Sequence, residues 1–231
     1  MGCVRRIGYL SLALLILGCS NGDDEKSDGT VDKIYSAGER AKVRNNLKQI
    51  GLASQNYNEV YRSFPNAPPK GKGLSWRVHL LPFLDHNALY QQFHLEEPWD
   101  SPHNKKLISQ MPAVFSRLNG PKDGKTTIHV FVGEGTPFGM KQPLRFRSIT
   151  DGTANTIMAI DAAPSTAVEW TKPGGLQFDR SNPSTLTKYL RPSGTESLYF
   201  DGRLKTIPEG MSAEVLSLLI QHADGQMIPE K

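Results

Sequence analysis

The sequence predicts an α+β fold in which a long N-terminal helix packs on an antiparallel sheet, with short helices after it and a helix at the C-terminus. Three observations predict it. Apolar or small side chains recur in steps of three and four over residues 41–65, the spacing of an amphipathic helix. Short β-like runs follow in the second half of the chain. Helical spacing returns after Ser212. Helices first and strands afterwards are typical of the α+β class.

The long helix is expected to begin near Thr30 to Asp32, either of which could cap it, and to end at Phe64, before a proline. Gly38 and Gly51 each lower its propensity by about 1 kcal/mol relative to alanine. Its stability must therefore come from burial of the apolar stripe. That stripe consists of Val43, Leu47, Ile50, Ser54, Tyr57, Tyr61 and Phe64.

Two short helices are expected over residues 75–93, with Ser75 as the first cap and Pro82 separating them. Ser101 is expected to cap a third, with the following proline at its first position, and Pro112 to end it.

The predicted strands occupy short runs with β-forming side chains. These runs are residues 113–118, 126–133, 145–149 and 156–161. A β-hairpin is expected where Asp201 and Gly202 form a turn between two further runs. Ser212 is expected to cap the last helix and Gly225 to stop it.

Composition limits the functional classes. The 231 residues are enough for one domain with a substantial core. Of the 27 basic residues, Arg5 and Arg6 lie in the leader described below, which leaves 25 basic against 23 acidic residues. A nucleic-acid partner is therefore not expected. The only cysteines, Cys3 and Cys19, lie near the N-terminus, so no disulfide is expected in the globular part.

The N-terminus has the pattern of a signal peptide. Two arginines precede an apolar run over residues 7–17, which is too short for a membrane-spanning helix of roughly twenty residues. The segment from Ile16 to Cys19 resembles the bacterial lipobox, in which the cysteine is acylated and the leader is cut before it. The alternatives are an ordinary secretory signal and N-myristoylation at Gly2, but Arg6 occupies the position of the Ser or Thr in that motif.

The chain is thus expected to comprise a lipoprotein signal peptide (residues 1–18), a flexible polar linker (19–29) and the α+β domain (30–231). Several acyl chains on Cys19 would hold the mature protein stably on a membrane. The predicted location is extracytoplasmic, in the cell envelope. Ser20 follows the cysteine where aspartate would direct retention in the inner membrane, which favours the outer membrane.

Four stretches resemble the planctomycete prepilin-like family that carries a domain of unknown function, number 1559. They are residues 44–65, 75–112, 149–179 and 199–208. The resemblance implies a fold similar to the heads of type IV pilins and type II secretion pseudopilins. It also implies a structural or protein-interaction role, with envelope or secretion-system proteins as partners.

The chain departs from this family in two places. The prepilin signature and its apolar helix are replaced by the lipobox and polar linker, which argues against filament assembly through that helix. Many members also carry a histidine ten residues before the last Asp-Gly pair, whereas this chain has Arg191 there.

No motif for catalysis is visible. The six histidines form no zinc motif and no nucleophile motif occurs, so neither an enzyme nor a cofactor is expected. An unrecognised extracytoplasmic enzyme is kept as one alternative. A ligand-binding or Ca²⁺-binding head is another alternative. Asp151 and Asn155 could offer oxygen ligands from one loop, and the resemblance to pseudopilin heads, some of which hold calcium on a loop, implies the same. The same loop also fits a tight turn whose side chains bond to the local backbone.

Overall fold

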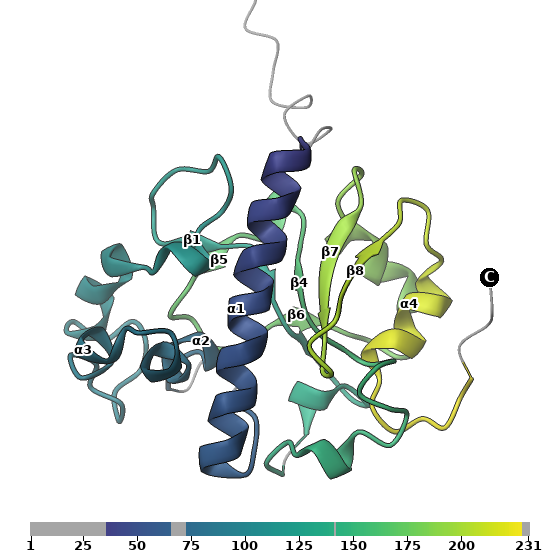
Figure 1. Ribbon diagram of the computed structural model, residues 1–231, viewed down its shortest axis with the longest axis horizontal. Helices are drawn as coiled ribbons and strands as arrows, with labels where there is room; N and C mark the ends of the chain where they lie inside the picture. Colours follow the sequence, from purple (N-terminus) through teal and green to yellow (C-terminus); the bar gives the residue numbers. More distant parts are fainter. Residues whose placement is uncertain (1–35, 66–72, 141, 228–231) are drawn as a thin grey trace, which may run out of the picture. The chain divides into compact units, whose positions relative to one another are not determined.

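The computed structural model describes residues 36–65, 73–140 and 142–227, all within one compact unit that spans residues 31–231. Its architecture is α+β, as predicted: the long helix α1 lies on an antiparallel sheet, short helices follow it, and α4 is near the C-terminus (Figure 1). Within these ranges, no helix combines the length and the apolar character that crossing a membrane requires.

The elements are as follows. The α-helices are α1 (Ala37–Tyr61), α2 (Trp76–His79), α3 (Asn87–Tyr90) and α4 (Ala213–Ile220). The strands are β1 (Lys125–Thr126), β2 (Ile128–His129), β3 (Phe131–Val132), β4 (Ile157–Asp161), β5 (Val168–Glu169), β6 (Leu176–Gln177), β7 (Thr195–Tyr199) and β8 (Leu204–Ile207). The 3-10 helices are η2 (Leu81–Phe83), η3 (Asn104–Gln110), η4 (Ala113–Phe115), η5 (Pro137–Gly139), η6 (Phe146–Ser148), η7 (Pro164–Thr166) and η8 (Pro183–Tyr189).

The predicted start of the long helix was wrong, because α1 begins at Ala37. Ser36 and Glu39 form a capping box, in which the serine Oγ accepts from the Glu39 N–H and the glutamate Oε2 accepts from the Ser36 N–H. This reciprocal pair satisfies two helix N–H groups and fixes the first turn there. The helix also ends before the predicted Phe64, since Arg62 adopts a left-handed conformation with φ 54°.

Four strands form the central sheet in the order β2-β4-β7-β8, all antiparallel. The hairpin predicted around Asp201 and Gly202 is confirmed as β7 and β8. In β4 the register shifts between Ile157 and Ala159, so Met158 and Ala159 pack in one core cluster while Ile157 and Ile160 pack in the other. This β-bulge breaks the strict alternation of β4, whose side chains still reach both core clusters.

The sheet is buried on both sides. Between α1 and the sheet lie Val43, Leu47, Ile50, Ala53, Met158, Ala159 and Leu198. Against α4 and η8 lie Ile157, Ile160, Leu186, Tyr199, Leu216, Leu219 and Ile220. The helix comes closest at Gly51, where a Cβ atom would lie 3.0 Å from Cδ1 of Leu198, so this glycine allows the close packing. Tyr61, predicted to belong to the buried stripe, is instead 56% exposed.

Ion pairs with the buried Glu196 link α1 to the sheet. Glu196 on β7 accepts from Arg40 Nη1 at 3.0 Å and from Arg44 Nη1 at 2.7 Å. Thr206 on β8 donates its hydroxyl to the same carboxylate at 2.9 Å. The two arginines are one helical turn apart, so both reach one carboxylate from the same face of α1.

Two predicted strands were wrong. Residues 113–118 and 145–149 instead contain the 3-10 helices η4 and η6, closed by i to i+3 hydrogen bonds such as Phe115 N–H to Pro112 O and Ser148 N–H to Arg145 O. The run 126–133 is extended but divided, since β1, β2 and β3 belong to three different sheets. The alternation of apolar residues in this run predicted an extended backbone, but it did not predict which strands would pair with it.

Of the predicted caps of the short helices, Ser75 is confirmed, since its Oγ accepts from the Arg77 N–H at the start of α2. Ser101 is not the N-cap of η3, which begins two residues later than expected and has His103 as its N-cap. The Ser101 Oγ still accepts from the Asn104 N–H at 3.1 Å. Ser212 caps α4 as predicted. That helix ends at Ile220, earlier than the predicted stop at Gly225, because the next residue is extended.

Candidate functional site

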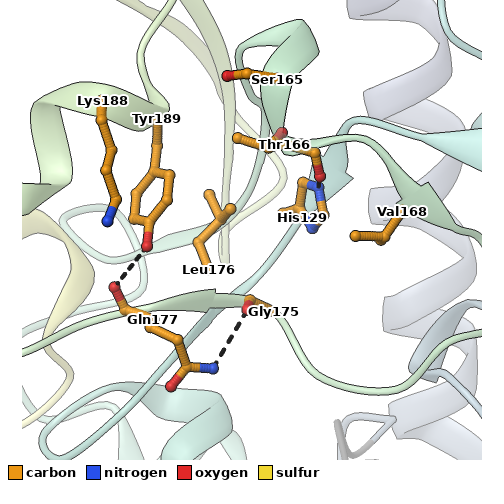
Figure 2. A pocket seen from close by; sticks show the side chains of 9 residues that line it. All are labelled: His129, Ser165, Thr166, Val168, Gly175, Leu176, Gln177, Lys188 and Tyr189. Atoms are coloured by element: carbon orange, nitrogen blue, oxygen red, sulfur yellow. Dashed lines mark hydrogen bonds between the residues drawn. The ribbon is translucent and has the colours of Figure 1, made fainter.

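A pocket of about 340 Å³ lies between η7, β6 and η8 (Figure 2). Its lining residues come from segments far apart in the chain: His129, Ser165, Thr166, Val168, Gly175, Leu176, Gln177, Lys188 and Tyr189. Because this volume lies within the range of about 300 to 1,000 Å³ typical of small-molecule sites, the pocket is large enough to hold a small ligand.

One end of the pocket is formed by His129, which β2 holds by pairing with β4. The ring accepts at Nδ1 from Nη2 of Arg77, 3.4 Å away, and donates from Nε2 to the Thr166 carbonyl at 3.0 Å. Because the guanidinium group of Arg77 can only donate, Nδ1 of His129 is the acceptor and Nε2 carries the proton. Burial, together with the nearby charge of Arg77, lowers the pKa of His129 to about 3. The imidazole is therefore neutral at pH 7, with both nitrogens engaged.

Arg77 is a fully buried cation behind that histidine. Its Nε donates to the Ile128 carbonyl at 3.0 Å, Nη2 donates to the same oxygen, and Nη1 donates to Ser75 Oγ at 2.9 Å. The guanidinium carbon lies 4.9 Å from the centre of the Trp76 ring. Burial lowers the pKa of Arg77 to about 9, so it remains charged at pH 7. Among the described residues, no carboxylate oxygen lies within 4.0 Å of its nitrogens.

The opposite end belongs to η8. Figure 2 shows Lys188 and Tyr189 side by side, with Leu176 between them and His129. The Tyr189 hydroxyl donates to the Gln177 carbonyl at 3.2 Å, and the Lys188 Nζ lies 5.0 Å from the centre of the tyrosine ring. The pocket thus has a cation at its rim and an apolar middle.

Both ring nitrogens of the pocket histidine already have hydrogen-bond partners. Nucleophilic catalysis needs a hydroxyl in hydrogen-bond contact with a base. Here the only histidine of the lining bonds to Arg77 and to the Thr166 carbonyl. Sequence reasoning did not bring Arg77 and His129 together, because 52 positions separate them and only the fold makes them neighbours.

The residues predicted as a Ca²⁺ site lie elsewhere. Asp151 accepts from the Asp224 N–H at 2.8 Å and from the Gly225 N–H at 3.0 Å, so its carboxylate ties this loop to the segment after α4. Asn155 donates to the Asp151 carbonyl at 3.2 Å, as expected for a self-bonded turn. Across the ranges described, no three His, Cys, Asp or Glu side chains are grouped as a metal site. Calcium binding here stays a prediction.

A family sequence profile matches residues 36–127 and 115–208, which together cover most of the chain. The chain belongs to the family described as protein of unknown function (DUF1559). This confirms the family that the four stretches resemble. No curated protein and no solved structure matches the chain.

In this DUF1559 chain, the side chain of Arg191 is held by contacts with Asp161 on β4. It is buried, its Nε donates to the Asp161 carbonyl at 3.1 Å, and its Nη2 lies 3.2 Å from Asp161 Oδ1. The Thr127 hydroxyl donates to the same oxygen at 2.6 Å. The arginine thus joins the segment before β7 to β4. Cys19, the predicted lipidation site, lies outside the described residues.

Proposed function

We propose that this DUF1559 chain is a lipid-anchored protein of the cell envelope whose α+β domain serves as a non-catalytic structural or protein-interaction module. The lipobox-like segment ending at Cys19 supports the anchor, and the polar residues after it would separate the domain from the membrane surface. The central sheet of the domain is covered on both faces by buried apolar side chains, which suits a module that presents a folded surface.

The observation that carries the interaction role is the outward face of α1. Leu52 is 56% exposed and Val60 63% exposed, and they lie eight positions apart on α1, which places them about 80° apart around the helix axis. Tyr61 follows at 56% exposure and contacts the rings of Tyr57 and Phe83. Three large apolar side chains exposed along one helix favour α1 as a contact site for another protein. The partner would present an apolar surface of its own.

Replacing Cys19 by alanine is expected to release the protein from the membrane fraction, because the acyl chains could no longer be attached. Fractionation of cells that express the full chain, with labelling by a radioactive fatty acid, would measure this. Cys3→Ala is the matched control and should remain labelled and membrane-bound. A Cys19→Ala protein that still sediments with membranes would contradict the anchor.

A photo-reactive amino acid at Val60 is expected to form a covalent adduct with an envelope protein in intact cells, since Val60 would lie at the contact. The same amino acid at Glu214, in the first turn of α4, is the control and should give far less of that adduct. Adducts of equal yield from both positions, or from neither, would argue against a partner on the outward face of α1.

A further inference from the structure

We propose that the pocket between η7, β6 and η8 binds a small organic anion, a carboxylate attached to an apolar body. This goes beyond the interaction role and does not depend on the membrane anchor. The inference is drawn from the charges around the pocket, its apolar middle and the fixed state of its histidine.

The first argument is the unbalanced charge behind the pocket wall. Arg77 is fully buried, and within the described ranges it has no carboxylate at ion-pair distance. Its contact with Nδ1 of His129 places the guanidinium next to a residue that lines the pocket. A buried charge is screened much less than an exposed one, so its potential reaches into the pocket. A bound anion would be attracted by that potential.

The second argument is the composition of the lining. None of the nine lining residues is acidic, and Lys188 adds a second cation at the rim. Its side chain is exposed and flexible, so its ammonium could leave the Tyr189 ring and reach a bound carboxylate. An anion in this pocket would thus contact the ammonium of Lys188, lie within the potential of Arg77 behind His129, and meet no negative charge from the lining.

The third argument is the apolar surface between the cations. Leu176 and the ring of Tyr189 lie between Lys188 and the histidine, and Val168 lines the pocket on the other side of His129, as Figure 2 shows. The histidine is neutral and both of its nitrogens are bonded, so it forms a fixed wall. A ligand with a flat or branched hydrocarbon part would cover this surface and leave its carboxylate for Lys188. Inorganic anions would gain only the electrostatic part of the binding energy.

Benzoate is a suitable probe, and benzamide is its neutral counterpart of nearly equal shape. The full-length chain, solubilised in a non-ionic detergent, would be titrated with each compound and the binding followed by NMR shifts of the His129 and Lys188 resonances. Benzoate is expected to bind about tenfold more tightly than benzamide, because only benzoate carries charge. Equal affinities for the two compounds, or no shift with benzoate, would overturn the proposal.

A pair of lysine variants then locates the site. Lys188→Gln is expected to weaken benzoate binding by about threefold or more, in line with the loss of one partly exposed charge contact. Lys172→Gln is the matched control, since Lys172 Nζ also lies over an aromatic ring, 5.6 Å from the centre of Trp99, but outside the pocket. It should bind benzoate as the wild type does. Equal effects of the two substitutions, or no effect of Lys188→Gln, would place binding elsewhere and overturn the assignment.

Discussion

Replacing Asp161 by asparagine is expected to lower the free energy of unfolding by about 3 to 5 kcal/mol, the usual cost of removing one member of a buried ion pair. The side chains of Asp161 and Arg191 are only 6% and 8% exposed. The variant would put a neutral amide in place of the carboxylate that lies 3.2 Å from the buried guanidinium of Arg191. It would also weaken the hydrogen bond that Thr127 donates to that carboxylate. Urea denaturation followed by circular dichroism would measure the loss.

The matched control for Asp161 is another Asp–Arg pair in the same chain. Asp201 contacts Arg203, whose side chain is 58% exposed, so Asp201→Asn should cost about 1 kcal/mol or less. Both substitutions replace a carboxylate by a neutral amide of nearly equal shape, in one pair that is buried and one that is partly exposed. If both variants lost the same stability, burial of the Asp161 pair would not explain its role.

Acidification from pH 7 to pH 5 is expected to remove about 2 kcal/mol of stability through His129 alone. The pKa of this histidine is about 3 in the folded chain, below its ordinary value of 6.5, because burial and Arg77 disfavour the charged ring. The unfolded chain therefore binds the proton first as the pH falls. The stability due to the neutral ring is fully present above pH 6.5 and is lost progressively between pH 6.5 and pH 3.

Denaturation of the wild type and of His129→Gln at both pH values would test this. Glutamine does not titrate, so the variant should be less stable than the wild type at pH 7 but lose about 2 kcal/mol less on acidification. The comparison cancels the titration of all other groups that the two proteins share. Parallel pH curves for the two proteins would show that His129 is not held neutral by the fold.

The elements predicted well are those whose signal is local. Val43, Leu47 and Ile50 form the buried stripe of α1 because a helix of any origin places such positions on one side. The turn at Asp201 and Gly202 also depends only on adjacent residues, and Gly202 has the positive φ of 85° that glycine accommodates. Ser212 likewise caps α4 by a bond to an N–H three residues away.

The elements predicted poorly depend on partners distant in sequence. The run 126–133 is extended, but the division of its strands among three sheets is set by pairing with β4, β5 and β6. Residues 145–149 include the β-forming Phe146 and Ile149, yet they close a 3-10 turn. The pocket was missed for the same reason, because Arg77, His129 and Lys188 carry no shared spacing. Their chemistry becomes visible only when β2, α2 and η8 are in place.

The two ion pairs that Glu196 makes with Arg40 and Arg44 have a mechanical consequence. Both arginines lie in the first two turns of α1, so a force pulling on the chain from its N-terminal side would reach these contacts before the apolar seam farther along the helix. The force would then act on α1 and β7 together, because two ion pairs connect them. A domain tethered at its N-terminal end would therefore resist unfolding that begins at the first turn of α1.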